Sequence, residues 1–226
     1  LWDRAGNESL ASASIEVDGT APQAGSFAIS ESPYSLSATV HLGASAIGAS
    51  HVRVSESATY ADNSWRALPL GNPDDTYVFA SQDGARTLYA WFKDAAGNVS
   101  DAYTATTFVD LNAPEPGAVL LTGWSYVDRN SGGIPVDALM EDNLLTVLAH
   151  VQLEARAVDG SGSGVTDMMI SNSSAFTGAT WVPYRTAAID WTLAPGAADD
   201  LARTVYVKFR DAAGRVSSSF ASGSIN

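Results

Sequence analysis

The sequence predicts an all-β chain with two β-sandwich domains in tandem. Three observations predict this class: a long internal repeat, apolar residues that alternate with polar ones inside each copy, and turn residues at short, even intervals. Alternation gives a strand one face for a core and one for solvent. About seven short strands per copy, each bounded by turn residues, is the pattern typical of a sandwich.

The internal repeat is the first of these observations. Residues 83–100, DGARTLYAWFKDAAGNVS, recur as residues 200–217, DLARTVYVKFRDAAGRVS, at an offset of 117. A shortened third copy opens the chain, because residues 3–7 match residues 94–98, and residues 17–25 match residues 109–117. Repetition at this scale indicates an array of similar domains.

The centre of each copy alternates in the way a half-buried strand does. Leu88, Ala90 and Phe92 fall on one face of the first copy, and the equivalent face of the second has Val205, Val207 and Phe209. The Asp-x-x-Gly segment that follows predicts a hairpin turn, with Asp94 and Asp211 accepting from backbone amides and Gly supplying positive φ.

The remaining strands are expected between turn signals. In the first copy these are 35–42, 51–55, 65–70, 76–80 and 99–109; in the second they are 151–158, 165–171, 181–185, 189–193 and 216–225. The predicted organisation is an opening strand at 1–20, a first domain at 21–111 and a second at 112–226. The joint 110–116 is short and contains Pro, which favours a stiff connection.

The second copy has an insertion at about 121–150, since the offset between copies grows from 91 to 117. Two interpretations of its apolar half remain open: a helix from Pro135 to His150, or a turn at 141–143 followed by a long strand. The segment either covers its own sandwich or docks a neighbour. In the second case Leu139, Met140 and Leu144 are the expected partner contacts.

Composition excludes several classes of function. The net charge is −13 and there are two lysines, whereas nucleic-acid binding needs clustered Lys and Arg. There is no cysteine, which excludes disulfides, thiolate metal sites and cysteine nucleophiles. No apolar run reaches the roughly 18 residues of a membrane span. An acidic chain without cysteine favours a prokaryotic secreted or cell-surface protein.

Several motifs together resemble the bacterial immunoglobulin-like repeats of large secreted and surface proteins. They are the FKDAAGNVS and FRDAAGRVS pair, the VDxxAP joints, and DGSGSGVTDMMISN ahead of the strand at Trp181. The resemblance implies two tandem immunoglobulin-like sandwiches, preceded by the terminal strand of a third repeat. It implies little about function, because such repeats serve as stalks, adhesin arms, filament bodies and enzyme appendages.

Candidate metal and catalytic residues are few. Asp18 and Asp110 stand at the joints before Ala-Pro, where oxygen-rich loops can hold Ca²⁺, although one carboxylate per joint needs help from neighbouring loops. No other cofactor is expected. The three histidines lack metal-ligand spacing, and no acid, base and nucleophile constellation is present. No catalytic residue is therefore predicted.

Aromatic residues suggest an alternative, because an exposed ring can stack on a sugar. Trp65 and Trp181 are equivalent, which favours a packing role in both copies. Trp91 aligns with Lys208, so its face is expected to be accessible, and Trp124 has no counterpart. Trp91 and Trp124 are therefore the candidate ligand residues for a surface glycan.

The opening strand has two explanations. Either it belongs to a preceding repeat of a longer array, or it inserts into a neighbouring copy, with Leu1 and Trp2 among the contacts. The expected function is a non-catalytic structural or adhesive module of an extracellular stalk, surface appendage or filament, with neighbouring repeats or copies of itself as partners. An accessory carbohydrate- or partner-binding module of a secreted enzyme is the alternative.

Overall fold

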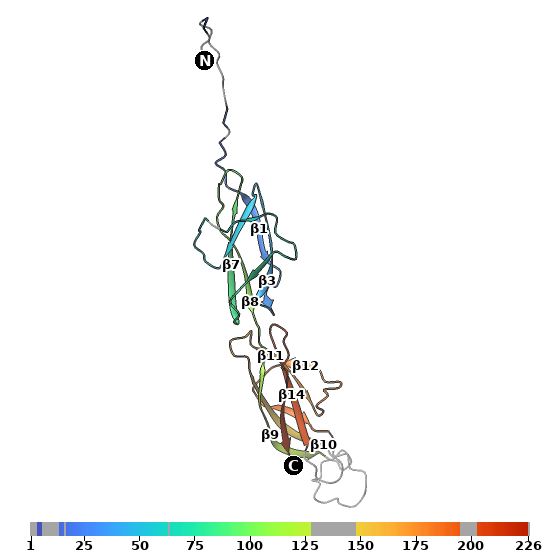
Figure 1. Cartoon of the computed structure of the whole chain (residues 1–226). Helices are drawn as coiled ribbons and strands as arrows, with labels where there is room; N and C mark the ends of the chain where they lie inside the picture. Colours follow the sequence, from blue (N-terminus) through green and yellow to red (C-terminus); the bar gives the residue numbers. More distant parts are fainter. Residues whose placement is uncertain are drawn as a thin grey trace, which may run out of the picture. The chain divides into compact units, whose positions relative to one another are not determined.

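The computed structural model describes residues 4–5, 14–15, 17–62, 64–127, 148–194 and 203–225, and every regular element in these ranges is a β-strand (Figure 1). The predicted all-β fold class is therefore confirmed. The chain forms two compact units: Leu1–Ser30, His41–Tyr77 and Thr87–Thr106 make the first, and Glu31–Val40, Val78–Arg86 and Thr107–Asn226 make the second. None of the described segments is a helix long and apolar enough to cross a membrane.

The first sandwich consists of a three-stranded and a five-stranded sheet. The smaller sheet has the order β1-β3-β6, and the larger β2-β8-β7-β4-β5. Strand β1 pairs with β3, and β4 pairs with β5 and β7, in antiparallel fashion, whereas β2 pairs with β8 in parallel. The strands are β1 (Gln23–Ile29), β2 (Tyr34–Ser35), β3 (Thr39–Ile47), β4 (His51–Ser55), β5 (Arg66–Ala67), β6 (Thr76–Val78), β7 (Gly84–Lys93) and β8 (Tyr103–Val109).

The core of the first sandwich follows the predicted alternation. Leu88, Ala90 and Phe92 on β7 are fully buried. Val40 and Leu42 on β3 are buried as well. Burial of a large apolar side chain is worth roughly 1.5–3 kcal/mol, so these alternating positions supply much of the stability of the sheet pair.

The second sandwich consists of a three-stranded sheet, β13-β10-β9, and a four-stranded sheet, β12-β11-β14-β15. Neighbouring strands within both of these sheets pair in antiparallel fashion. The strands are β9 (Glu115–Val127), β10 (Leu148–Val158), β11 (Val165–Ser171), β12 (Trp181–Pro183), β13 (Ile189–Thr192), β14 (Arg203–Asp211) and β15 (Ala221–Ile225).

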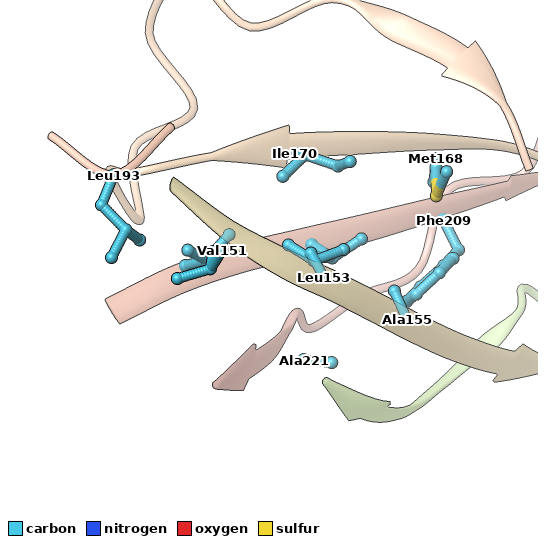
Figure 2. Close-up of a cluster of buried hydrophobic side chains, with 10 residues drawn as sticks. Val151, Leu153, Ala155, Met168, Ile170, Leu193, Phe209 and Ala221 are labelled. Atoms are coloured by element: carbon cyan, nitrogen blue, oxygen red, sulfur yellow. The ribbon is translucent and has the colours of Figure 1, made fainter. Parts of the chain in front are cut away.

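Side chains from both sheets meet in the second core (Figure 2). Leu153 on β10, Met168 on β11 and Phe209 on β14 are fully buried. The predicted inward face Val205, Val207 and Phe209 is thus confirmed. At one edge β15 runs so close to β9 that a Cβ atom at Gly223 would lie 2.7 Å from the carbonyl oxygen of Val119.

Several strands differ from expectation. Strands β1 and β9 were not predicted, and the segment expected as one strand at 35–42 contributes to two strands, β2 and β3. The predicted insertion overlaps β9, whose Val127 pairs with Leu148 of β10. Residues 148–150 are therefore part of a strand. The predicted helix, which was to run from Pro135 to His150, is wrong for these last three residues. Residues 128–147, including Leu139, Met140 and Leu144, lie outside the described residues, as do Leu1 and Trp2.

The predicted hairpin turns are present in both copies. Oδ1 of Asp94 accepts hydrogen bonds from the N–H groups of Gly97 (2.7 Å) and Asn98 (2.8 Å). Oδ1 of Asp211 accepts one from the N–H of Arg215 at 2.8 Å. Gly97 and Gly214 have φ values of 99° and 90°, a conformation that glycine adopts without steric cost.

Candidate cation site

Three aspartates from distant parts of the sequence converge in the second compact unit. Asp110 directly follows β8, Asp159 begins the loop between β10 and β11, and Asp211 ends β14. One carboxylate oxygen of each lies within 4.8 Å of the others. Among the described residues this is the one group of three or more potential metal ligands that the structure brings together.

Asp110 is fixed by its backbone and by its side chain. Its N–H donates to the carbonyl of Ser35 at 2.8 Å. Its Oδ2 atom accepts a hydrogen bond from the N–H of Ser163 (2.9 Å), and its Oδ1 atom accepts one from the N–H of Asn112 (3.3 Å). The residue has no exposed surface. A carboxylate is thereby held at the start of the joint 110–116, next to the β10–β11 loop.

Asp159 is placed by the glycines that follow it. Its Oδ2 atom accepts from the N–H of Gly164 at 2.6 Å, and its carbonyl accepts from the N–H of Gly162 at 2.7 Å. Gly160 and Gly164 have φ values of 51° and 90°, so the loop curls around the carboxylate. Its other oxygen, Oδ1, is buried and accepts no hydrogen bond.

Asp211 combines a turn role with an unsatisfied oxygen. Oδ1 caps the turn through Arg215, whereas Oδ2 is buried and has no hydrogen-bond partner. The whole residue is only 2% exposed. A buried carboxylate oxygen without a partner is costly, and native proteins nearly always satisfy such atoms.

The electrostatics of the cluster disfavour three bare carboxylates. Burial raises the pKa of Asp159 above its ordinary value, and the charges of Asp110 and Asp211 raise it further. Burial likewise raises the pKa of Asp211, with Asp110 adding to the effect. Among the ion pairs of the described residues none includes a member of the cluster. The guanidinium of Arg215 lies nearby, but its Nε donates to the main-chain carbonyl of Asp110.

Chemically, the cluster offers oxygen ligands and negative charge. Hard divalent cations such as Ca²⁺ prefer this donor set, whereas soft metals prefer sulfur and imidazole. Asp110 was a predicted cation ligand, and the structure places it with Asp159 and Asp211. Both partners were missed, because Asp159 stands in a segment expected to be a plain connector and Asp211 was assigned to its turn alone.

The other predicted cation ligand, Asp18, lies outside this cluster. It is exposed, and its Oδ1 atom accepts from the N–H of Thr20 at 2.9 Å. The Nδ2 of Asn98 donates to its carbonyl at 3.0 Å. In the first sandwich the loop equivalent to 159–164 is the shorter 48–50, Gly-Ala-Ser, which has no carboxylate.

The prediction that Trp91 is accessible was wrong. Trp91 is only 5% exposed, because neighbouring side chains cover its ring. Arg53 lies over the ring at 5.0 Å, and the Tyr60 and Tyr89 rings pack against it with centroids 5.8 and 6.3 Å away. Alignment with Lys208 revealed which face the residue occupies but not what covers that face. The Trp124 side chain lies outside what the structure describes.

Comparison with known proteins gives distant similarity only. No protein-family model matches the chain, and a search of curated proteins found no relative. Among solved structures, the fibronectin(III)-like modules of CbhA from Clostridium thermocellum are 13% identical, with 88% of this chain and 93% of that chain covered and a TM-score of 0.42. A tetra-tandem repeat from the extending region of a large adhesion protein is 18% identical, with 90% of this chain covered and a TM-score of 0.27. This chain spans half the length of that second structure.

Proposed function

We propose that this chain is a non-catalytic structural or adhesive repeat module of an extracellular stalk, surface appendage or filament. The observation that carries the proposal is what the two repeat copies have in common. Several described residues that recur between them, such as Ser100 and Ser217, or Trp65 and Trp181, make contacts within their own sandwich and so contribute to its framework. A framework repeated in tandem is typical of load-bearing arrays.

The recurring serines illustrate this framework role. The N–H of Phe92 donates to Oγ of Ser100 at 3.1 Å, and the N–H of Phe209 donates to Oγ of Ser217 at 3.2 Å. Each serine N–H donates back to the carbonyl of the same phenylalanine at 2.9 Å. The segment after each hairpin is thus fastened to the central strand by the same pair of hydrogen bonds.

The recurring tryptophans are also used internally. Nζ of Lys93 lies 4.2 Å from the ring centroid of Trp65, and Cζ of Arg210 lies 4.6 Å from that of Trp181. Lys93 and Arg210 are themselves equivalent in the repeat. With a basic side chain over each ring and Trp91 buried, the aromatic residues support packing, and the alternative of a carbohydrate-binding module loses its best candidate.

Single-molecule force spectroscopy tests the structural role. The chain, placed between two domains of known unfolding length, should give two unfolding events. The first sandwich runs from residue 23 to residue 109, so its event should release roughly 30 nm at ~3.5 Å per extended residue. Extension without resolved unfolding events would contradict a load-bearing role. Each flanking domain serves as the internal control for a single tether.

Assembly through the opening segment is the finer form of this proposal. Ile15 and Val17 are 87% and 83% exposed, an alternating apolar pair that supports a segment whose partner is another chain. Light scattering on the chain with and without residues 1–20 tests it. Concentration-dependent linear oligomers that need residues 1–20 would support strand exchange. A monomer in both cases would contradict it and leave the structural role intact.

A further inference from the structure

The acidic cluster of the second unit has a feature that a turn or a solvated surface does not explain. Two of its carboxylate oxygens, Oδ1 of Asp159 and Oδ2 of Asp211, are buried without a hydrogen-bond partner in the same small volume. Asp110 and Asp211 are 0% and 2% exposed, so water does not compensate their charge. Three acceptor groups face one another, and no donor hydrogen bonds to these two oxygens.

We propose that Asp110, Asp159 and Asp211 form a Ca²⁺ site, each contributing one carboxylate oxygen. The proposal goes beyond the structural role of the chain, because it assigns a ligand that the framework itself does not need. A bound cation would satisfy both orphaned oxygens and offset the repulsion among the three charges.

The donor set and the spacing of the cluster fit calcium. Oxygens bound to one Ca²⁺ at about 2.3–2.6 Å lie at most ~5 Å apart, and those of the cluster lie within 4.8 Å of one another. Mg²⁺ demands near-ideal octahedral geometry and usually keeps several waters, so three protein carboxylates in fixed positions suit it less well. A backbone amide holds each carboxylate, which preorganises the ligands.

The first sandwich is a built-in control for the site. Its hairpin residue Asp94 is the counterpart of Asp211, and Asp18 is the counterpart of Asp110. No counterpart of Asp159 exists, because the first sandwich has a loop of three residues (48–50) where the second has six (159–164). The site is therefore a property of the second copy and not of the repeat in general.

The test is calorimetric titration of the purified, chelator-treated chain with CaCl₂, with MgCl₂ in parallel. One Ca²⁺ per chain is expected, with a Kd on the order of 10⁻⁴–10⁻³ M or tighter, as for extracellular calcium modules. Asp211→Asn and Asp159→Asn should each weaken binding at least tenfold, whereas the matched Asp94→Asn should leave it unchanged. Absence of binding, or binding that survives in both cluster variants, would overturn the proposal.

Hydrogen exchange separates a ligand role from a merely structural one. At ~100 Kd of Ca²⁺, amides at 159–164 and 211–215 should gain protection, while those at 48–50 and 94–98 should not change. Removing a repelling charge should make the Asp211→Asn chain at least as stable as the calcium-free parent while abolishing its response to calcium. Equal protection in both copies, or a full calcium response in the variant, would overturn the assignment.

Discussion

A Cβ atom at Gly162 would lie 2.6 Å from Oδ2 of Asp159, closer than real Cβ contacts come. It would also lie 2.9 Å from the carbonyl oxygen of Asp159, which is backbone and cannot swing aside. The glycine is thus the reason that the β10–β11 loop can fold back onto the carboxylate that begins it.

Gly162→Ala should therefore disturb the cluster without removing any charge. We expect the loop to shift and the affinity for Ca²⁺ to fall by about tenfold, because ligand position and not ligand number is changed. Calorimetry with CaCl₂ measures the effect. Gly19→Ala is the control, since a Cβ atom there meets nothing within 4 Å. An unchanged affinity in Gly162→Ala would contradict the proposed loop geometry.

The Phe–Ser pairs predict separable effects on the two sandwiches. Ser100→Ala and Ser217→Ala each leave a buried phenylalanine N–H without its acceptor, which costs about 1–3 kcal/mol of unfolding free energy. Chemical denaturation, monitored by hydrogen exchange in each copy, measures the two sandwiches separately. Ser100→Ala should lower the unfolding free energy of the first sandwich, and Ser217→Ala that of the second. A loss shared equally by both sandwiches in either variant would argue against the pairing as described.

The hairpin carboxylate of the first sandwich predicts a dependence on pH. The pKa of Asp94 is lowered below its ordinary 3.8, chiefly by the hydrogen bond from Asn98, against the opposing effect of burial. A carboxyl with a lowered pKa in the folded state stabilises the fold above 3.8, and this contribution is lost as pH falls through the folded value. Asp94→Asn should thus be less stable than the parent at pH 7.

Denaturation curves at several pH values check this sign. The difference in unfolding free energy between parent and Asp94→Asn should be constant from pH 7 down to about 5 and should shrink below pH 3.8. A difference that persists unchanged to pH 2 would mean that the amide–carboxylate hydrogen bonds, and not the charge, account for the effect.

The contact of β15 with β9 predicts a steric limit at one glycine. Gly223→Ala would place a methyl group 2.7 Å from the backbone oxygen of Val119, so the edge of the second sandwich should lose about 1–3 kcal/mol. Thermal unfolding measures the loss. Gly43→Ala on β3 is the matched strand control, because its Cβ would have open space and should be neutral or mildly stabilising.

The fold was largely predictable because its strongest signal is physical alternation. Strands β7 and β14 follow directly from Leu88, Ala90, Phe92 and their counterparts, which must all face one core. Strands β1 and β9 were not predicted. Gly25 near the start of β1, and Pro116 and Gly117 near the start of β9, weaken the strand pattern there. The closing part of β9, from residue 121 to residue 127, also fell inside the segment interpreted as an insertion.

The site was predictable only in part because its three members come from separate turns. Asp110 stood out at a repeated joint, but the length of the 159–164 loop is the signal that would have found Asp159. That loop exceeds its counterpart by three residues and begins with an acid. Asp211 was correctly assigned to its turn through Oδ1, and only the structure reveals that Oδ2 points elsewhere.

Asp110 has a practical consequence for dissecting the chain. By sequence repetition it closes the first copy, yet its carboxylate lies among groups of the second unit. A fragment cut at residue 112 would retain every strand of the second sandwich and lose one of three cluster aspartates. The smallest piece that carries the complete acidic cluster therefore has to begin before Asp110, upstream of the boundary between the two sequence repeats.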